Sequence, residues 1–437
     1  MSFDASPAPV QRIAIIGGGI SGLAAAYRLA GTHHVTLFEA EPRLGGHART
    51  VMAGAKGDRP VDTGFIVFNY ANYPHLTEMF AALDVPVEPS DMSFGATIDG
   101  GRVEYGLKSL AALVGQKRNL LRPGFIRMVR DIFRFNAGAE AAAKDEHMTI
   151  GEMVEDMKLG AWFQRYYLMP ICGAIWSTSP EDIRAFPARA LVQFFRNHAL
   201  LSATGQHQWW TVSGGSVEYV RRLEAHLMGR GADLRTGAPI AKVRRDEMGV
   251  EITPVGGAPE RFDQVIFACH SDTALKLLET PSAPETGALA DLRYQDNRVV
   301  LHRDASFMPK RKTCWSSWVY QAKSDESRTQ IGVTYWMNRL QNIPEHDPLF
   351  VTLNPAHTPD PAMVYDEVTF RHPVFDHAAL RAQGEIAALQ GQNRTWFAGA
   401  YLGNGFHEDG FASAVRVADA LTAQVAVSAT AATIAAQ

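Results

Sequence analysis

The first fifty residues alternate between short apolar runs and polar turns. Apolar residues occupy positions 13–16 and again 35–38, and an Ala-rich stretch lies between these runs, just after three glycines. A continuous apolar run of this length, bounded by turn residues, is typical of a buried strand, and the Ala-rich stretch favours a helix. The pattern therefore predicts a strand–turn–helix–strand unit over residues 12–50.

Later stretches carry the same signatures. We expect strands or hairpins over residues 61–69, 97–106, 263–272, 298–302, 315–321, 329–337 and 395–399. Helices are expected after Gly214 and Gly215 and again from Phe411. The aromatic residues between 315 and 337 alternate along the chain, so one face of a mainly antiparallel sheet should pack helices and the other should wall a pocket.

The turn of the first unit carries Gly17, Gly19 and Gly22 in G-x-G-x-x-G spacing. Gly17 permits the tight turn, Gly19 lets the backbone approach a diphosphate, and Gly22 lets helix and strand pack closely. The N-terminus of the following helix offers N–H groups and its dipole to an anion. Glu39 follows about 20 residues later, where a carboxylate can accept hydrogen bonds from a ribose. The unit therefore predicts a dinucleotide site.

Arg43, Gly45 and Gly46 come directly after Glu39, in the order E-x-x-x-R-x-G-G. Two more glycines and an arginine add backbone and a cation near a bound diphosphate. This extended motif resembles the flavin-dependent amine oxidase, protoporphyrinogen oxidase and phytoene desaturase superfamily, and simple NAD dehydrogenases seldom show it. The resemblance implies FAD as the cofactor.

The resemblance extends to three later segments. Asp62 and Gly64 lie where the superfamily brings a loop back toward the flavin, and the main chain of Val243 would face the adenine. The strand–loop–helix over residues 395–421 would cradle the ribityl chain and the flavin ring. It implies flavin contacts for Gly399, Glu408, Asp409, Gly410 and Phe411. Amine oxidases often place a flavin-linking cysteine in this loop, which has none here, so we expect non-covalent FAD.

These segments are far apart in the chain, so the predicted fold is α/β (α+β overall) with a discontinuous, Rossmann-like FAD-binding domain. We assign residues 1–89, 206–272 and 395–437 to it. Residues 90–205 and 273–394 are assigned to a substrate-binding domain of helices over an antiparallel sheet. A chain of 437 residues is too long for one compact core, which agrees with two domains.

Composition narrows the class of protein. Hydrophobic residues make up 46% of the chain and charged residues 20%, as in ordinary globular proteins, and the net charge of −4 argues against general nucleic-acid binding. Cys172, Cys269 and Cys314 are widely spaced, which favours a reducing compartment and no structural metal site. Residues 1–10 show no secretory signal, and no apolar run is long enough to span a bilayer, so we expect the cytoplasm.

Residues 107–138 depart from this balance, with seven Lys or Arg residues against a single acid, Asp131. An apolar stripe at helical spacing comprises Phe125, Met128, Val129, Ile132 and Phe133, and Arg127, Arg130 and Arg134 line the other side. A basic amphipathic helix of this kind is typical of a surface that lies on anionic lipid. A solvated basic face over an ordinary core stripe is the alternative, and both stay open.

The expected flavin loop also holds the best-placed titratable group, His407. An imidazole with a pKa near 6.5 can take a proton at neutral pH, so His407 is the candidate base, although a histidine that only holds backbone is the alternative. Cys269 and His270 lie at the end of a predicted strand, where α/β sheets place ligand contacts. For His270 a structural role is favoured.

The aromatic residues of 166–216 fit either an ordinary core or a pocket for a long apolar substrate. The H-E-D-G, S-D-M-S-F and D-T-G-F-I-V-F-N segments resemble a bacterial branch of the superfamily linked to lipid acyl-chain modification. We therefore expect an FAD-dependent oxidoreductase that abstracts hydride from a C–H bond of a fatty-acyl substrate and so desaturates it. An amine oxidase is the first alternative, and a flavin-bearing lipid-binding protein without turnover is the second. The sequence leaves the electron acceptor open.

Overall fold

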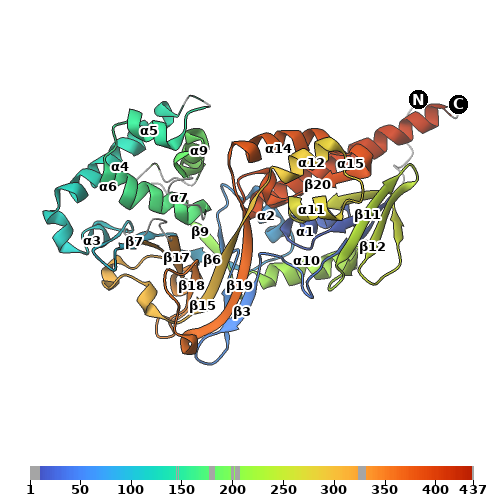
Figure 1. Ribbon diagram of the computed structural model, residues 1–437. Coiled ribbons are helices and arrows are strands. Elements are labelled where there is room, and N and C mark those ends of the chain that lie inside the picture. The colour runs from blue at the N-terminus through green and yellow to red at the C-terminus, as the bar shows by residue number, and fades with distance from the viewer. Residues whose placement is uncertain are drawn as a thin grey trace, which may run out of the picture.

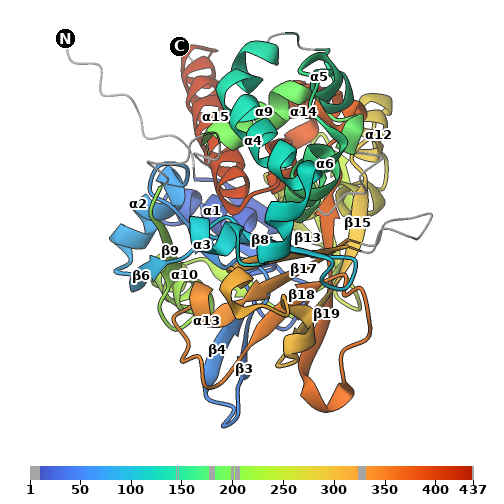
Figure 2. The same ribbon diagram turned by 90° about the vertical axis from the view of Figure 1, so that its left-hand side faces the viewer.

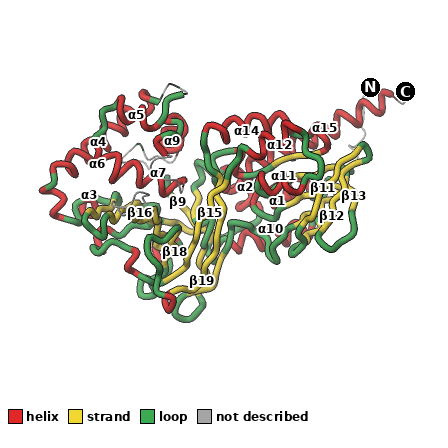
Figure 3. Tube along the Cα trace, viewed as in Figure 1, coloured by secondary structure: helices red, strands yellow, loops and turns green. Residues whose placement is uncertain are grey.

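The computed structural model describes residues 10–143, 145, 147–176, 183–197, 201, 207–322 and 331–435 (Figure 1). Two lobes lie side by side, and the long strands β15 (Tyr294–His302) and β19 (Val364–Pro373) run between them. Helices and strands occur in both lobes (Figure 3), as the predicted fold class requires. Nearly all of residues 1–10, on which the expectation about a secretory signal rests, lies outside the described part.

A five-stranded parallel sheet forms the core of the first lobe. Its order is β10 (Asp233–Arg235), β2 (His34–Phe38), β1 (Arg12–Ile16), β14 (Gln264–Phe267) and β20 (Thr395–Phe397). All neighbouring pairs are parallel, and four of the five residues of β1 are buried. A parallel sheet buried on both faces needs continuous apolar strands, which explains the runs seen in the sequence.

Each face of this sheet packs a different layer. Ile13 and Ile15 face α1 (Ile20–Leu29), α10 (Val217–Gly229) and α15 (His407–Ala435). Ala14 and Ile16 face the opposite layer. That layer contains the antiparallel sheet of β11 (Ile240–Asp246), β12 (Gly249–Pro254) and β13 (Glu260–Phe262), and the helices α11 (Ser271–Leu277), α12 (Ala283–Ala290) and α14 (His377–Leu389).

The strands of the five-stranded sheet all come from the three segments assigned to FAD binding. The helices α11, α12 and α14, however, fall within residues 273–394, which we assigned to the substrate domain. Their apolar residues pack in one cluster with Val265, Phe267 and Phe397 of the five-stranded sheet. By packing, therefore, the second lobe takes from this segment only the part between β15 and β19.

A seven-stranded sheet spans the second lobe. Its order is β19, β15, β18 (Phe350–Leu353), β17 (Ile331–Trp336), β16 (Trp318–Ala322), β7 (Phe94–Ile98) and β8 (Val103–Gly106). Every pair is antiparallel except β16 with β7, so the prediction of a mainly antiparallel sheet is confirmed.

The two faces of this sheet are used differently from our expectation. Trp318 and Tyr320 lie on the same face, two residues apart. Trp318 packs against the large apolar cluster that runs through both lobes, whereas Tyr320 belongs to the core of the helical region. One face thus contributes to both of these clusters. The opposite face packs a small cluster that includes Val319 and Trp336.

The helical region covers the far end of the second lobe. It consists of α3 (Leu110–Leu113), η1 (Lys117–Leu121), α4 (Pro123–Ala142), α5 (Ile150–Asp156), α6 (Ala161–Phe163), η2 (Gln164–Leu168), α7 (Met169–Trp176) and α9 (Ala188–Asn197). Figure 2 shows α3, α4 and α6 on the side of the molecule that lies at the left of Figure 1, away from β11 and β12. In the described residues no helix is long and apolar enough to cross a membrane.

Short elements connect the lobes. Two strands, β3 (Thr50–Ala53) and β4 (Arg59–Asp62), form a hairpin, and β5 (Val67–Phe68), β9 (Trp209–Val212) and β6 (Val87–Ser90) form a small antiparallel sheet. The helix α2 (Pro74–Ala82) packs against α15, and α13 (Met337–Leu340) lies between β17 and β18 in the chain. The C-terminal helix was expected to begin at Phe411, but α15 begins at His407 and continues to Ala435.

Candidate functional site

The turn between β1 and α1 is held by two glycines. Gly17 has φ +111°, and a Cβ there would lie 2.7 Å from the carbonyl oxygen of Ala268 on the neighbouring strand end. A Cβ on Gly22 would lie 1.8 Å from the carbonyl oxygen of Gly17. Both distances are shorter than any non-bonded contact, so the fold itself requires glycine at these positions.

Gly19 is different. Its φ is −74°, which any residue can adopt, and a Cβ there would have no neighbour within 4 Å. Gly19 is the N-cap of α1, and no side chain caps that helix end. The space beside Gly19 and the N–H groups of the first turn, which no side chain caps, fit a diphosphate, because a helix N-terminus attracts an anion.

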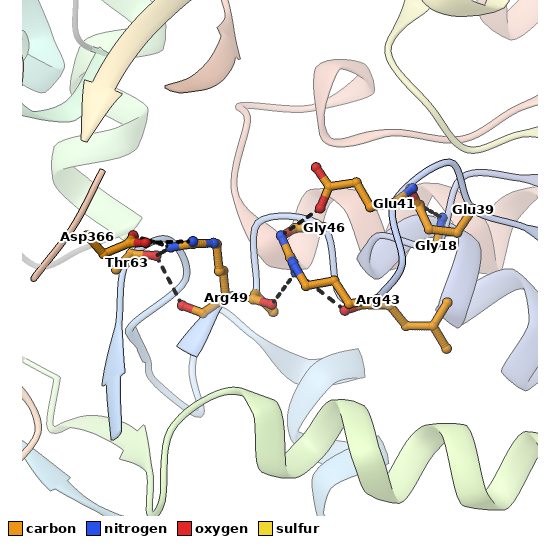
Figure 4. Close-up of polar contacts among 10 residues, drawn as sticks. Gly18, Glu39, Glu41, Arg43, Gly46, Arg49, Thr63 and Asp366 are labelled. Atoms are coloured by element: carbon orange, nitrogen blue, oxygen red, sulfur yellow. Dashed lines mark hydrogen bonds and ion pairs between the residues drawn. The ribbon is translucent and has the colours of Figure 1, made fainter. Parts of the chain in front are cut away.

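The second glycine pair lies against this turn. The amide of Gly45 donates to the carbonyl oxygen of Gly18 over 2.8 Å, and a Cβ on Gly46 would lie 3.0 Å from the Cα of Gly19. The guanidinium of Arg43 donates to the carbonyl oxygen of Gly46 over 2.9 Å and pairs with Glu41 at 3.2 Å (Figure 4). Arg43 therefore shapes the loop that covers the turn, and its expected contact with a diphosphate stays a prediction.

Glu39 lies at the end of β2, beside the same turn. Its carboxylate accepts from the amide of Gly18 at 2.6 Å and from the amide of Glu41 at 2.8 Å (Figure 4). The structure thus brings the acid and the glycine motif together at the carboxyl ends of neighbouring parallel strands, where α/β folds bind nucleotides.

The N-terminus of α15 meets the N-terminus of α1. A Cβ on Gly410 would lie 2.9 Å from the side chains of Ile20 and Ser21. Two helices with the same polarity thus direct their positive ends to one place, which suits a ligand that carries negative charge at more than one position. Phe411 is buried beneath this junction, and its ring lies parallel to that of His75 at 6.2 Å.

The acids of the H-E-D-G segment are bound to backbone. Glu408 accepts from the amides of His75 at 2.9 Å and Leu76 at 3.0 Å, so it caps the N-terminus of α2. Burial raises its pKa to about 7. Asp409 accepts from the amide of Phe406 at 2.9 Å, and burial raises its pKa as well. Their expected contact with the flavin stays a prediction, since both carboxylates already serve the chain.

Asp62 is fully buried at the junction of the lobes. Its carboxylate accepts from the hydroxyls of Thr50 at 2.6 Å and Ser216 at 2.7 Å, from the Ser216 amide at 2.8 Å and from the Gln341 side chain at 2.9 Å. Burial raises its pKa to about 6. The carboxylate therefore joins β3, α10 and the second lobe, and its flavin contact remains untested.

Three further predicted residues are fixed by close packing. A Cβ on Gly64 would lie 1.9 Å from the carbonyl oxygen of His47, and a Cβ on Gly399 would lie 2.2 Å from the ring of Tyr401. The carbonyl oxygen of Val243 accepts from the amide of Glu279 at 3.0 Å. This oxygen is already engaged, and the contact between Val243 and an adenine stays a prediction.

The environment of His407 differs from our expectation. Its Nε2 lies 2.6 Å from the hydroxyl of Tyr219, and its ring stacks on Phe65 at 4.0 Å. The expected pKa near 6.5 is wrong, because burial lowers the pKa of His407 to about 3. The imidazole is therefore neutral at pH 7, and its assignment as a base stays a prediction.

Sequence reasoning missed a group of histidines beside this site. The ring of His47 lies 6.1 Å from that of His270, 5.5 Å from that of His372 and 4.6 Å from that of Phe370. Burial lowers the pKa of His47 well below its usual range and lowers those of His270 and His372 to about 4.

All three imidazoles are half-buried. Only the position of His47 directly after the glycine pair could have suggested it. No group of three His, Cys, Asp or Glu in the described residues is placed to hold a metal ion.

A row of side chains crosses the seven-stranded sheet and ends beside the loop that follows Gly45 and Gly46. Phe94, Trp318 and Tyr335 are register partners on adjacent strands, and the Trp318 and Tyr335 rings meet edge to face at 4.9 Å. The row continues through Val351 and Leu301 to Asp366 of β19, which pairs with Arg49 through two bonds, of 2.6 and 3.0 Å (Figure 4). The loop that follows Gly46 is thus tied to one end of this row, and the aromatic side chains lie at its other end.

Comparison with known proteins agrees with these features. The family described as "Flavin containing amine oxidoreductase" matches residues 20–356. Protoporphyrinogen oxidase of Bos taurus is 24% identical over 332 residues, which is 66% of this chain and 66% of that protein. The chain therefore aligns with just under two thirds of the length of this curated relative.

Two solved structures share the fold. Cyclohexylamine oxidase from Brevibacterium oxydans has a TM-score of 0.69 at 17% identity and covers 95% of this chain and 100% of its own. A CLA-producing fatty acid isomerase from P. acnes has a TM-score of 0.66 at 15% identity and covers 94% of this chain and 98% of its own. Both likenesses concern the fold.

Proposed function

The chain belongs to the flavin containing amine oxidoreductase family, and from that premise we propose that it removes hydride from a C–H bond of a fatty-acyl substrate and so desaturates it. Bound FAD supplies a two-electron acceptor for such a hydride. The single observation that carries the choice of substrate is the aromatic row on the seven-stranded sheet, formed by Phe94, Trp318 and Tyr335. The same line of side chains continues to Asp366, which pairs with Arg49 of the loop after Gly46.

The residues that would hold FAD without a covalent link lie at the meeting point of α1 and α15. The first turn of α1 and the open position beside Gly19 would take the diphosphate, and the carboxylate of Glu39 would accept from the ribose hydroxyls. The N-terminus of α15, next to Gly410, would stabilise negative charge on a reduced ring.

The aromatic row favours a hydrocarbon chain over an amine. Phe94, Trp318 and Tyr335 offer apolar surface, which is what binds an acyl chain. The acid of the row, Asp366, is already paired with Arg49, so it does not offer a free countercharge to an ammonium. The indole N–H of Trp318 is buried and has no acceptor among the described residues, so it is available to a carbonyl group of a substrate.

Desaturation also releases a proton, and His407 is the proposed acceptor. In this proposal Nε2 carries the hydrogen and donates it to the Tyr219 hydroxyl oxygen, so Nδ1 is the nitrogen that would take the proton. Because burial lowers the pKa of His407 to about 3, the imidazole is neutral at pH 7, has a nitrogen lone pair that can accept a proton, and favours giving that proton up again. The other buried histidines stay neutral at pH 7 and keep positive charge away from the apolar site.

The test is anaerobic mixing of the holoenzyme with fatty-acyl lipids in detergent and, separately, with primary amines. We expect an acyl lipid to bleach the flavin and to lose two hydrogen atoms, which mass spectrometry of the lipid would show. Bleaching by amines alone would identify an amine oxidase instead, the activity that the name of the Brevibacterium structure carries. If neither a lipid nor an amine reduces the flavin, the result would indicate a flavin-bearing lipid-binding protein without turnover.

A further inference from the structure

The basic helix α4 does not present the face that its sequence suggested. Of the apolar stripe expected to meet lipid, Phe125 and Met128 are buried in the core of the helical region, and Val129 and Ile132 are half-buried against it. That stripe therefore belongs to the protein interior, and its proposed insertion into lipid is wrong for these residues.

The outward face of α4 is apolar and basic at once. Ile126, Arg130 and Phe133 follow at i, i+4 and i+7, so they share one side of the helix, and they are 57%, 65% and 62% exposed. Exposure of such large apolar side chains to water is unfavourable, and a surface that covered them would lower the free energy.

The segments before α4 extend this surface. Leu110 of α3 is 81% exposed, and Leu120 and Leu121 of η1 are 50% and 85% exposed. Six of the 13 large hydrophobic residues that are exposed in the described chain fall between residues 107 and 133, so the exposure is clustered rather than scattered. We name five of them the apolar patch: Leu110, Leu120, Leu121, Ile126 and Phe133.

Positive charge surrounds the apolar patch. Lys117 and Arg118 of η1 are exposed, and within the described residues neither forms an ion pair. Arg127 and Arg130 lie 4.0 and 3.9 Å from the buried carboxylate of Asp131, too far for strong pairing. Arg134 is different, since it donates both to Asp131 at 3.1 Å and to a backbone oxygen of Met157 at 2.8 Å.

We propose that the face formed by α3, η1 and the outward side of α4 docks on an anionic lipid bilayer. Cations would pair with head groups while the neighbouring leucines and Phe133 enter the acyl boundary, the combination typical of interfacial helices. The inference rests on the proposed function in one respect: a lipid substrate explains why an oxidoreductase needs such a face. The same face is remote from β11 and β12 of the first lobe (Figures 1 and 2).

The test measures partitioning of the holoenzyme onto phosphatidylcholine vesicles with and without phosphatidylglycerol. Leu110→Ser with Leu121→Ser should weaken binding at least about tenfold per leucine, because about 1.5–3 kcal/mol accompanies full burial of such a side chain. Lys117→Gln with Arg118→Gln should weaken binding about fivefold per charge, at about 1 kcal/mol each, only when anionic lipid is present. Added salt should act in the same direction.

The matched control is Met248→Ser with Val255→Ser. These residues are 84% and 61% exposed, but they lie by β12 at the other end of the molecule, so vesicle binding should stay unchanged. Arg134 is left intact, because its loss would leave the buried carboxylate of Asp131 without its paired cation and so destabilise the fold.

Three results would overturn the docking surface: equal binding by all variants, no binding to anionic vesicles, or concentration-dependent dimers that the leucine variant abolishes. The last would make the patch a contact between two copies of the chain. FAD content and turnover of a detergent-dispersed lipid should be the same in every variant. Vesicle binding without lipid turnover would refute the proposed function and leave the docking surface standing.

Discussion

The N-termini of α1 and α15 meet beside Gly410, yet they are built differently. At α1 the chain keeps side chains away: Gly19 has open space beside it and no residue caps the helix. At α15 the first turn is full of polar side chains, and these bind other parts of the chain, as Glu408 does when it caps α2. One helix end is left free for a ligand, and the other also ties neighbouring segments together.

This difference shows which features a sequence displays directly. A glycine demanded by a clash between backbone atoms leaves a mark in the local sequence, because only one residue type fits. A buried carboxylate leaves no such mark, since its partners lie far along the chain, as Gln341 does for Asp62. The two ends can therefore be separated by substitutions that affect ligand binding alone or the fold alone.

The largest effect should come from the two glycines of the α1 turn. Gly22→Ala places a methyl group 1.8 Å from the Gly17 backbone oxygen, so the loss of stability should exceed the about 1–3 kcal/mol that is typical of overpacking, and most of the folded yield should be lost. Gly19→Ala meets no atom of the chain, so the apoprotein should melt like wild type while FAD content falls sharply. Thermal melting and the flavin-to-protein ratio would check both. Normal FAD content in Gly19→Ala would show that the diphosphate lies elsewhere.

Asp62→Ala should come next in size. The change leaves the Ser216 amide, the Thr50 hydroxyl and the Gln341 amide without their buried acceptor, and each such loss costs about 1–3 kcal/mol. Chemical denaturation should show a loss of several kcal/mol, and Asp62→Asn should lose less because its carbonyl oxygen still accepts. A stable Asp62→Ala protein that has lost only FAD would instead support the predicted flavin contact.

The buried histidines should make the protein sensitive to acid. Burial lowers the pKa of His270 and His372 to about 4 and that of His407 to about 3, while unfolded histidines titrate near 6.5. The unfolded state therefore binds more protons between pH 6.5 and 4, and stability should fall as the pH falls through this window.

Three carboxyl groups oppose this trend. The pKa of Asp62 is raised to about 6, that of Glu408 to about 7, and that of Asp409 is raised as well, so their contribution to stability is lost as the pH rises. With His47 and His302, whose pKa values burial also lowers, the imidazoles outnumber these carboxyl groups, and the melting temperature should still decline from pH 6.5 to 4. His372→Gln should flatten this slope; a variant with the wild-type slope would mean that His372 is solvated.

Glu39→Ala tests the ligand side of the comparison. A carboxylate that binds ribose hydroxyls contributes roughly 1.5–3 kcal/mol per hydrogen bond, so FAD affinity should fall by about one to two orders of magnitude. Titration of the apoprotein with FAD would measure it. Glu39→Gln keeps an acceptor oxygen and should lose less. Unchanged FAD affinity in both variants would mean that the Glu39 carboxylate only holds the backbone amide of Gly18 and does not bind the ribose.

Glu408→Ala should give the smallest effect and the clearest contrast. Loss of the cap on α2 should cost about 0.5–2 kcal/mol, with FAD affinity retained. Glu408→Gln keeps one acceptor and should recover part of the loss. If Glu408→Ala weakened FAD binding as strongly as Glu39→Ala, the two helix ends would serve the ligand alike, and the comparison drawn above would fail.

Much of the fold could be predicted from the sequence because its signals are local. The glycine spacing and apolar runs place the first strand–turn–helix–strand unit correctly, and the antiparallel second sheet follows from short alternating strands. The sequence could not show that α4 turns Phe125 and Met128 inward, because which side of an amphipathic helix meets the core depends on its neighbours. Nor could it bring together His47, His270 and His372, which come from three distant segments.

The most direct test of the account is the rate of flavin reduction by a deuterated acyl chain. The holoenzyme would be mixed without oxygen with a fatty-acyl lipid whose chain carries hydrogen and, in parallel, with the same lipid carrying deuterium. We predict that the lipid bleaches the flavin and that deuterium slows the bleaching several-fold, because the C–H bond breaks as hydride leaves. Absence of bleaching by any acyl lipid, together with reduction by an amine, would contradict the account.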